Sequence, residues 1–380
     1  MIEVYRIIDR FTITDKGFVY SFETKAVQSL KLNDIVYDLQ GNEFQVSGVE
    51  MIRRAPDQAD NGSVSQKGFL FQSKNGEQAM GSILLKKKPT LHFLFSSDPL
   101  DCRKVDSDYL EEYTYASKNY DCALFSLERF EEGKPFIFGD SIQGITIYRG
   151  WMLSVDEYRK LYIELLSKGI YLINTPEEYE RYHHLPKWYQ SFEGETFESF
   201  WSTSDKLEDI EKKVGDKKGA FIVKDYVKSR KHEWYEACYI DNIANQMNFR
   251  EIVTNFVKRQ GSQFVGGIVL RKYEKLNYIG FHDKSGMPIA EEYRIFVYAG
   301  KILIIGDYWN GNTDGYLSSS EITWIKSIVQ KVNSNFVTID VARKEDGSLI
   351  LMEFGDGQVS GLQELGEKEF YAAFALLLSI

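Results

Sequence analysis

The chain has 380 residues, of which 43% are hydrophobic and 14% aromatic, a composition typical of folded globular domains and not of disordered segments. Its net charge of −10 argues against sequence-independent binding to nucleic acid, which relies on neutralising many phosphates. No apolar run reaches the ~18 residues that cross a bilayer. The first residues also lack the basic and then apolar order of a signal peptide, so we expect a cytoplasmic protein.

The first 88 residues alternate between apolar and polar side chains with a period of two, the pattern of half-buried β-strands. Turn signals at residues 15–17, 39–42 and 56–62 separate the alternating segments. Many short strands without a helical stretch predict a small all-β barrel or sandwich. The predicted strands are residues 9–14, 17–22, 32–39, 44–52 and 82–85.

The following region changes to strands that alternate with helices. Residues 90–95 form a continuous apolar run, and residues 105–118 have the acidic, aromatic-rich pattern of a helix. Ser154 followed by Glu157 is the signature of a capping box, and it predicts a helix that ends at Gly169. This rhythm predicts a small α/β layer with further strands at residues 123–126, 145–148 and 170–174.

The last 160 residues place charged side chains inside or directly after short apolar runs that are predicted strands. A charged side chain at such a position is costly to bury unless it is paired or faces a ligand. Cations come first along the chain and carboxylates last. Cations screen phosphate oxygens and a hard metal ion takes carboxylate ligands, so the set suggests a nucleotide site. The charged residues are Lys224, Lys231, Arg271, Arg294, Asp340 and Glu353.

Five segments in this order resemble the ATP-grasp family, and within it the divergent clade defined by one arginine and two lysines, which includes an assembly factor of translation. The segments are residues 221–234, 269–273, 292–297, 339–341 and 352–361. The resemblance covers roughly residues 90–380. It implies a multidomain α+β protein in which a preATP-grasp α/β domain, residues 89–200, precedes an ATP-grasp nucleotide- and metal-binding domain of two α+β subdomains, residues 201–380.

The resemblance also implies roles for single residues. Lys224 and Lys231 would contact the phosphates of ATP. The segment Arg271, Lys272 and Tyr273 would lie at the hinge against adenine. Backbone groups of this segment would bind the adenine edge, so its position in the fold is more informative than its side chains. Arg294 would bind a γ-phosphate or an acyl phosphate, and Asp340 and Glu353 would bind Mg²⁺. Surface lysines and a structural salt bridge of Arg294 are the alternatives.

The chain departs from the family pattern at one position. ATP-grasp proteins usually carry an asparagine two residues after the second metal carboxylate, whereas this chain has Gly355. A glycine side chain cannot bind a metal. We therefore expect Asp356 to supply the third metal ligand, brought inward by a turn at Gly355-Asp356-Gly357.

The first 88 residues resemble the second domain of translational GTPases of the elongation factor Tu type. The matching segments are residues 11–17, 30–36 and 46–52. Those GTPases hold their nucleotide on a separate domain, whose phosphate loop and switch motifs this chain lacks. The resemblance implies a translation-factor-like β-barrel, residues 1–88, that acts as an interaction module. A purely structural support is the alternative.

Together, these features predict an ATP- and Mg²⁺-dependent ligase that joins a carboxylate to an amine through an acyl phosphate, with Arg294 and Lys231 as catalytic residues. The expected substrate is a peptide or a protein. An ATP-binding assembly chaperone for a translation factor is the second hypothesis, and nucleotidyl transfer to RNA fits an acidic chain less well. Arg149 and Arg103 are further candidates for a carboxylate or phosphate contact, whereas all five histidines are expected on the surface or in packing roles.

Overall fold

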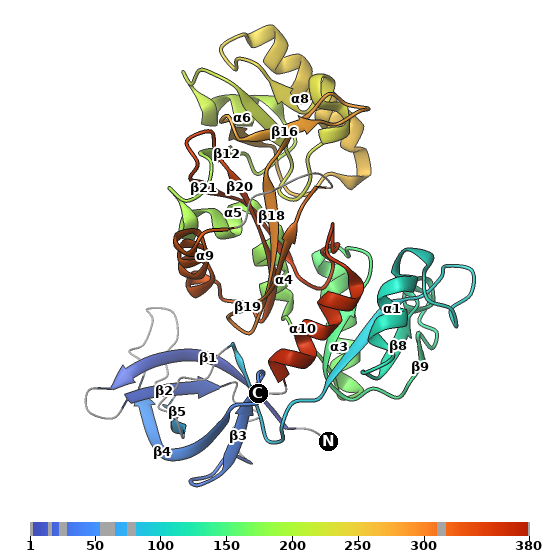
Figure 1. The fold of residues 1–380 in the computed structure, drawn as a ribbon, viewed down its shortest axis with the longest axis vertical. Helices are drawn as coiled ribbons and strands as arrows, with labels where there is room; N and C mark the ends of the chain where they lie inside the picture. The colour runs from blue at the N-terminus through green and yellow to red at the C-terminus, as the bar shows by residue number, and fades with distance from the viewer. Residues whose placement is uncertain are drawn as a thin grey trace.

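The computed structural model describes residues 3–13, 17–22, 29–53, 65–73, 81–309 and 317–378. These residues form a closed barrel, a mostly parallel sheet with helices, two further four-stranded sheets and one two-stranded sheet. Figure 1 shows the barrel at one end, the parallel sheet beside it, and the remaining sheets extending toward the other end. Within the described residues, no helix combines the length and the apolar character needed to cross a lipid bilayer.

The predicted all-β module is a six-stranded barrel, closed in the order β1-β2-β5-β4-β3-β6. Alternating side chains of its strands, such as Tyr5, Phe22 and Phe69, fill the interior. The strand at residues 65–73 was missed, because its continuous run Gly68–Phe71 hides the alternation. The predicted turn 15–17, except Gly17, and the loop 56–62 lie outside the described residues. The strands are Val4–Ile13 (β1), Gly17–Phe22 (β2), Ile35–Asp38 (β3), Glu43–Arg53 (β4), Ser65–Ser73 (β5) and Ile83–Leu85 (β6).

Buried hydrogen bonds attach the barrel to the rest of the molecule. Arg6 Nη2 donates to the carbonyl of Leu172 (2.8 Å), and the Ser82 amide donates to Asn335 Oδ1 (2.8 Å). The Tyr298 hydroxyl donates to the carbonyl of Leu39 (3.1 Å). These contacts reach two different sheets, so the barrel is held against the body in one orientation.

The second sheet has the order β11-β10-β7-β8-β9 and is parallel except for β9. It confirms the predicted α/β layer. The capping box of Ser154 with Glu157 is present, and Gly169 follows the helix with φ +77°. Its elements are Leu91–Ser96 (β7), Leu110–Ala116 (α1), Cys122–Phe125 (β8), Leu127–Glu131 (α2), Ile137–Gly139 (β9), Gly144–Arg149 (β10), Val155–Ser167 (α3), Ile170–Leu172 (β11), Pro176–His183 (α4) and Leu185–Trp188 (α5).

The remaining two four-stranded sheets, in the orders β12-β15-β13-β14 and β19-β18-β20-β21, carry the predicted charged strands. Thr196 forms a bridge to Leu351, and Leu276 to Lys344, so the chain ties the two sheets together. The elements are Ser199–Trp201 (β12), Leu207–Val214 (α6), Phe221–Lys224 (β13), Trp234–Ala237 (α7), Tyr239–Ile240 (β14), Gln246–Gln260 (α8), Val269–Lys272 (β15), Tyr278–Phe281 (β16), Pro288–Ala290 (β17), Glu292–Tyr298 (β18), Lys301–Asp307 (β19), Ser319–Lys331 (α9), Phe336–Arg343 (β20), Leu349–Asp356 (β21) and Glu367–Leu378 (α10).

The C-terminal helix α10 returns to the second sheet. Its residues Phe370, Tyr371 and Phe374 share one core with Phe93 and Phe95 of β7. Figure 1 shows α10 lying between the last sheet and the helices of the second sheet. The last sheet and the α/β layer are therefore packed as neighbours around a common aromatic core.

Candidate functional site

Three of the predicted charges lie side by side across β18, β20 and β21. The strand register pairs Arg294 with Asp340, and Asp340 with Glu353. Residues directly opposite each other in antiparallel strands project from the same face. The pairing therefore forms one row of charge, cation then two carboxylates, on a single face of the sheet.

Arg294 and Asp340 form a buried, two-pronged ion pair. Arg294 Nε and Nη2 donate to the two carboxylate oxygens of Asp340 (2.8 and 2.7 Å), and Nη1 donates to the carbonyl of Gly361 (2.9 Å). Burial acts against the charge of Arg294, but the Asp340 carboxylate raises its pKa above the ordinary value. Arg294 therefore forms the structural salt bridge that was the alternative, and it also lines a cavity. Its guanidinium lies close to the Tyr308 ring (4.7 Å).

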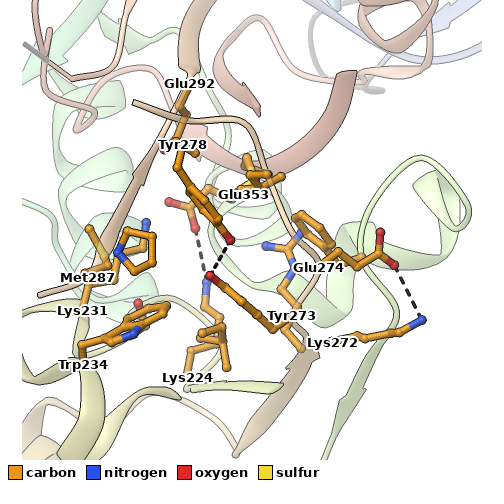
Figure 2. Close-up of a pocket in the computed structure, with 18 of the residues that line it drawn as sticks. Lys224, Lys231, Trp234, Lys272, Tyr273, Glu274, Tyr278, Met287, Glu292 and Glu353 are labelled. Carbon is orange, nitrogen blue, oxygen red and sulfur yellow. Dashed lines mark hydrogen bonds and ion pairs between the residues drawn. The ribbon is translucent and has the colours of Figure 1, made fainter. Parts of the chain in front are cut away.

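The opposing sheet brings Lys224 to this row. Lys224 is the last residue of β13, and its buried Nζ lies 3.3 Å from Glu353 Oε2. Figure 2 shows this ion pair in the cavity between the two sheets. Burial acts to raise the pKa of Glu353, but Lys224, Lys231 and Arg271 outweigh it and lower that pKa to about 2. Glu353 is therefore a carboxylate at any physiological pH.

Lys231 reaches the same cavity from a short 3-10 turn, Lys231–Glu233. Its Nζ lies over the Tyr308 ring (6.0 Å), and within the described part of the chain it has no hydrogen bond or ion pair. Burial acts to lower its pKa, but Glu292, Tyr308 and Glu353 raise it above the ordinary value. A fully charged ammonium without a close partner is suited to bind an anionic group of a ligand.

The predicted hinge segment consists of the last two residues of β15, Arg271 and Lys272, and of Tyr273, and all three line the cavity. Arg271 is buried and donates through Nη2 to Thr196 Oγ1 and to the carbonyl of Leu351, while its Nε has no partner among the described residues. Burial lowers the pKa of Arg271 to about 10. The exposed Lys272 pairs with Glu274 (3.6 Å), and the Tyr273 hydroxyl bonds to Tyr278 (2.6 Å).

The backbone of this segment is already engaged. The Lys272 amide donates to Glu198 and the Tyr273 amide to Ala220 (2.8 and 2.9 Å). These two N–H groups are therefore not available to a base edge. A base would have to be read by the residues that follow Tyr273, next to the apolar walls supplied by Trp234 and Met287.

Asp356 lies on the opposite face of β21 from Glu353. An odd spacing of three residues along a strand reverses the side-chain direction. Asp356 is 1% exposed and accepts hydrogen bonds from Asn174 Nδ2 (2.6 Å), the Gln358 amide (2.9 Å) and Gln358 Nε2 (3.1 Å). The structure therefore does not bring Asp356 to Asp340 and Glu353, and the expectation that it is the third metal ligand is corrected.

The structure also explains why glycine stands at position 355. A Cβ on Gly355 would lie 2.6 Å from Thr338 Oγ1 and 2.7 Å from Ser360 Oγ, far inside van der Waals contact. These two hydroxyls bond to each other (2.8 Å). The space that a side chain would need on the Glu353 face is therefore occupied by the Thr338–Ser360 pair.

The two arginines proposed for substrate contact lie elsewhere. Arg149 is 1% exposed, and it pairs with both oxygens of Glu112 (2.8 Å each). It also donates to the carbonyls of Gly357, Gln358 and Ser360 (2.8, 3.2 and 3.0 Å). Arg149 is thus a buried support for the loop after β21. Arg103 lies exposed in a surface turn, and neither arginine lines the cavity.

Sequence reasoning did not assign Glu292, which lines the cavity beside the row of charges. Burial raises its pKa to about 7, and Trp309 Nε1 donates to its Oε2 (3.0 Å). A signal was available, because Glu292 precedes Arg294 by two residues and strand periodicity places both on one face. Cavity residues such as Trp234, Met287 and Tyr278 carried no such signal, since apolar side chains also fill ordinary cores.

A second cavity adjoins the first. Both are lined by Lys224 and Glu353, so this ion pair stands between them. The second cavity also includes Arg294 and Asp340 and reaches His183 of α4. His183 was expected in a packing role, and its ring does pack on Tyr179 (centroids 4.2 Å apart) while it also lines this cavity. Glu353 thus borders both cavities, whereas Arg294 and Asp340 border the second.

A magnesium ion suits Asp340 and Glu353. Mg²⁺ is usually held by one or two protein carboxylates together with phosphate oxygens and water. Among the described residues there is no group of three or more His, Cys, Asp or Glu placed to hold a metal. Asp340 and Glu353 would thus supply the two protein carboxylates of such a site.

Comparisons with known proteins agree with this geometry. Residues 213–374 match a family model described as an ATP-grasp domain, family 3 of the clade named for its one arginine and two lysines. No curated protein matches the chain significantly. The family match and the two sheets around the charged cavity show that the chain has an ATP-grasp fold, preceded by a β-barrel, as the resemblance implied.

Solved structures give matches of low sequence identity. A RimK domain protein ATP-grasp from Sphaerobacter thermophilus DSM 20745 is 11% identical, with a TM-score of 0.48 over 76% of this chain and 100% of that chain. D-alanyl-alanine synthetase A from Vibrio cholerae O1 biovar eltor is 12% identical, with a TM-score of 0.49 over 76% and 97%. The ATP-grasp ligase PsnB, complexed with minimal precursor, Mg and ADP, is 10% identical, with a TM-score of 0.46 over 76% and 98%.

Proposed function

We propose that this protein is an ATP- and Mg²⁺-dependent ligase that joins a carboxylate to an amine, with a peptide or protein as one substrate. The convergence of charges carries the proposal. Cations from two sheets meet two carboxylates at two adjoining cavities, the first of which has aromatic walls. The match of residues 213–374 to an ATP-grasp family model supports ATP as the nucleotide.

In the proposed complex the base lies against Trp234 and Met287, and the phosphates extend toward Lys224 and Lys231. Asp340 and Glu353 would hold Mg²⁺, which neutralises phosphate charge. For that, Lys224 and Arg294 exchange their carboxylate partners for phosphate oxygens. The Lys224–Glu353 pair (3.3 Å) and the Arg294–Asp340 pair (2.7 Å) therefore describe the protein without ligand, and both pairs would break when Mg·ATP binds.

The acceptor would bind in the second cavity, which the Lys224–Glu353 pair separates from the nucleotide. Its carboxylate oxygen attacks the γ-phosphorus of ATP, the bond to the β-phosphate oxygen breaks, and ADP leaves. Arg294 and Lys231 stabilise the charge on the transferred group. An amine then attacks the acyl carbon, loses a proton and displaces inorganic phosphate. The protein supplies position and charge, and ATP supplies the leaving group.

Two surface features support a macromolecular substrate. Met152 lines the second cavity and is 40% exposed, and its neighbour Trp151 is 50% exposed, so the rim presents apolar side chains to solvent. Hydrogen bonds of Arg6, Ser82 and Leu39 attach the barrel to the body, which suits a docking module better than a free arm. Its resemblance to a translation-factor domain stays a prediction, and a protein of the translation machinery is the partner we would test first.

Product analysis tests the proposal. The protein is incubated with Mg·ATP and a peptide library, and the nucleotides are separated by chromatography. ADP with phosphate that depends on an amine, and that is lost in Lys231→Met, supports the ligase. AMP with pyrophosphate contradicts it. Tight Mg·ATP binding without turnover in any mixture favours the assembly chaperone instead.

A further inference from the structure

The second cavity contains one polar side chain that the proposed chemistry leaves without a role. His183 is the last residue of α4, is 7% exposed, and lines the second cavity together with Arg294, Asp340 and Glu353. An imidazole at such a place is available to a ligand.

The hydrogen bonds of His183 fix its tautomer. Nδ1 lies 3.0 Å from the carbonyl oxygen of Tyr179. A carbonyl oxygen can only accept, so the proton sits on Nδ1 and Nε2 carries a lone pair. Within the part of the chain that the structure describes, Nε2 has no hydrogen-bond partner. Burial also lowers the pKa of His183 to about 4, so the ring stays neutral at physiological pH.

The ring is held rigidly in this orientation. It packs on the Tyr179 ring (centroids 4.2 Å apart), and Tyr179 stacks in turn on Tyr158 of α3 (4.0 Å). The Tyr179 hydroxyl bonds to both the amide and the carbonyl of Leu153 (3.0 and 2.8 Å). Leu153 follows Met152, which lines the same cavity. His183 is therefore an acceptor fixed in place before any ligand arrives.

We propose that Nε2 of His183 accepts a hydrogen bond from the amine that attacks the acyl phosphate, and so positions that amine in the second cavity. A neutral acceptor discriminates between ligands, because it binds an N–H group but repels the lone pairs of a second carboxylate. The role is positioning and not proton removal, since a base of such low basicity extracts a proton poorly. This inference rests on the proposed ligase function.

The first test needs no variant. The tautomer is read from long-range ¹H–¹⁵N spectra of the uniformly labelled protein, where we expect an unprotonated Nε2. The protein with Mg²⁺ and a non-hydrolysable ATP analogue is then titrated with n-butylamine and, separately, with butyrate. We expect the Nε2 resonance to move with the amine and to stay with butyrate. An Nε2–H tautomer, a shift with butyrate alone, a shift with the nucleotide alone, or no shift with either probe overturns the proposal.

The second test uses a matched pair of variants. His183→Phe keeps an aromatic ring on Tyr179 but removes the acceptor, and we expect the apparent affinity for n-butylamine to fall about threefold to tenfold. His184→Phe changes the neighbouring histidine, which does not line the cavity, and should leave that affinity unchanged. Equal losses in both variants overturn the proposal. Calorimetry with Mg·ATP is run on the unmodified protein and on both variants. Absence of nucleotide binding in the unmodified protein would contradict the ligase function itself and not the role of His183.

Discussion

Two carboxylates of strand β21, three residues apart, have opposite surroundings. Glu353 faces cations from both sheets, which lower its pKa to about 2 against the effect of burial. Asp356 faces the α/β layer, where burial raises its pKa to about 7 and its closest partners, Asn174 and Gln358, are uncharged amides. The comparison teaches that the face of the strand decides which carboxylate can serve a metal and which one holds the fold together.

Replacing Arg149, which holds the loop after Asp356, should give the largest effect on stability. Arg149→Met leaves Glu112 buried without its cation and leaves three loop carbonyls without a donor. We expect a loss of about 3–5 kcal/mol in the free energy of unfolding. Chemical denaturation measures this loss. Arg159→Met is the control: Arg159 forms an exposed ion pair with Glu177, and its loss should not change the denaturation midpoint. A fully stable Arg149→Met protein would show that this arginine is not a structural support.

The second effect is on Mg·ATP affinity, which should depend on Glu353 and not on Asp356. Glu353→Gln should weaken Mg·ATP binding at least about 100-fold, because it removes a proposed metal ligand. Asp356→Asn should leave that affinity within about threefold. Isothermal titration calorimetry of folded variants measures both. Equal losses in the two variants would mean that β21 presents one site and not two separate faces.

The pH dependence of stability should have opposite signs for the two residues. The pKa of Asp356 is raised on folding, so the native state binds the extra proton and stability falls as pH rises from about 4 to about 7. We expect roughly 2 kcal/mol from this group between pH 5 and pH 7, absent in Asp356→Asn. The pKa of Glu353 is lowered, so its contribution is present above about pH 4.5 and is lost as pH falls toward 2. Unfolding curves of the unmodified protein and of Asp356→Asn across pH 5–8 measure the contribution of Asp356, and identical pH slopes of these two proteins would contradict the assignment.

The smallest effect concerns Lys231, the cation of the 3-10 turn that follows β13. Lys231→Met should weaken Mg·ATP binding about tenfold, because one charge-assisted contact to phosphate is lost. Lys228→Met changes the exposed lysine between Lys224 and Lys231. Lys228 lines the second cavity and not the first, so its loss should leave the nucleotide affinity unchanged. Fluorescence competition with a labelled ATP analogue compares the two. Losses of the same size would show that only net charge matters, and not the position of Lys231.

Much of the fold was predictable because local patterns agree with the tertiary structure. The period-2 strands of the barrel, the capping box at Ser154 and the glycine after α3 each follow from short-range chemistry. The strand at residues 65–73 was missed where an apolar run obscured the alternation. The predicted site residues, except Asp356, are divided between two adjoining cavities. Lys224 and Glu353 line both, Lys231 and Arg271 line the first, and Arg294 and Asp340 line the second.

The sequence by itself determined which residues carry charge within apolar strands, and therefore that Lys224, Arg294, Asp340 and Glu353 need partners or a ligand. Only the tertiary structure decided which of them meet, because strand register and the approach of a second sheet are long-range properties. It removed Asp356 from the site, since three residues along a strand reverse the face. It also placed Glu292 at the first cavity and His183 at the second, positions that exist only after the two sheets, and for His183 also α4, have packed together.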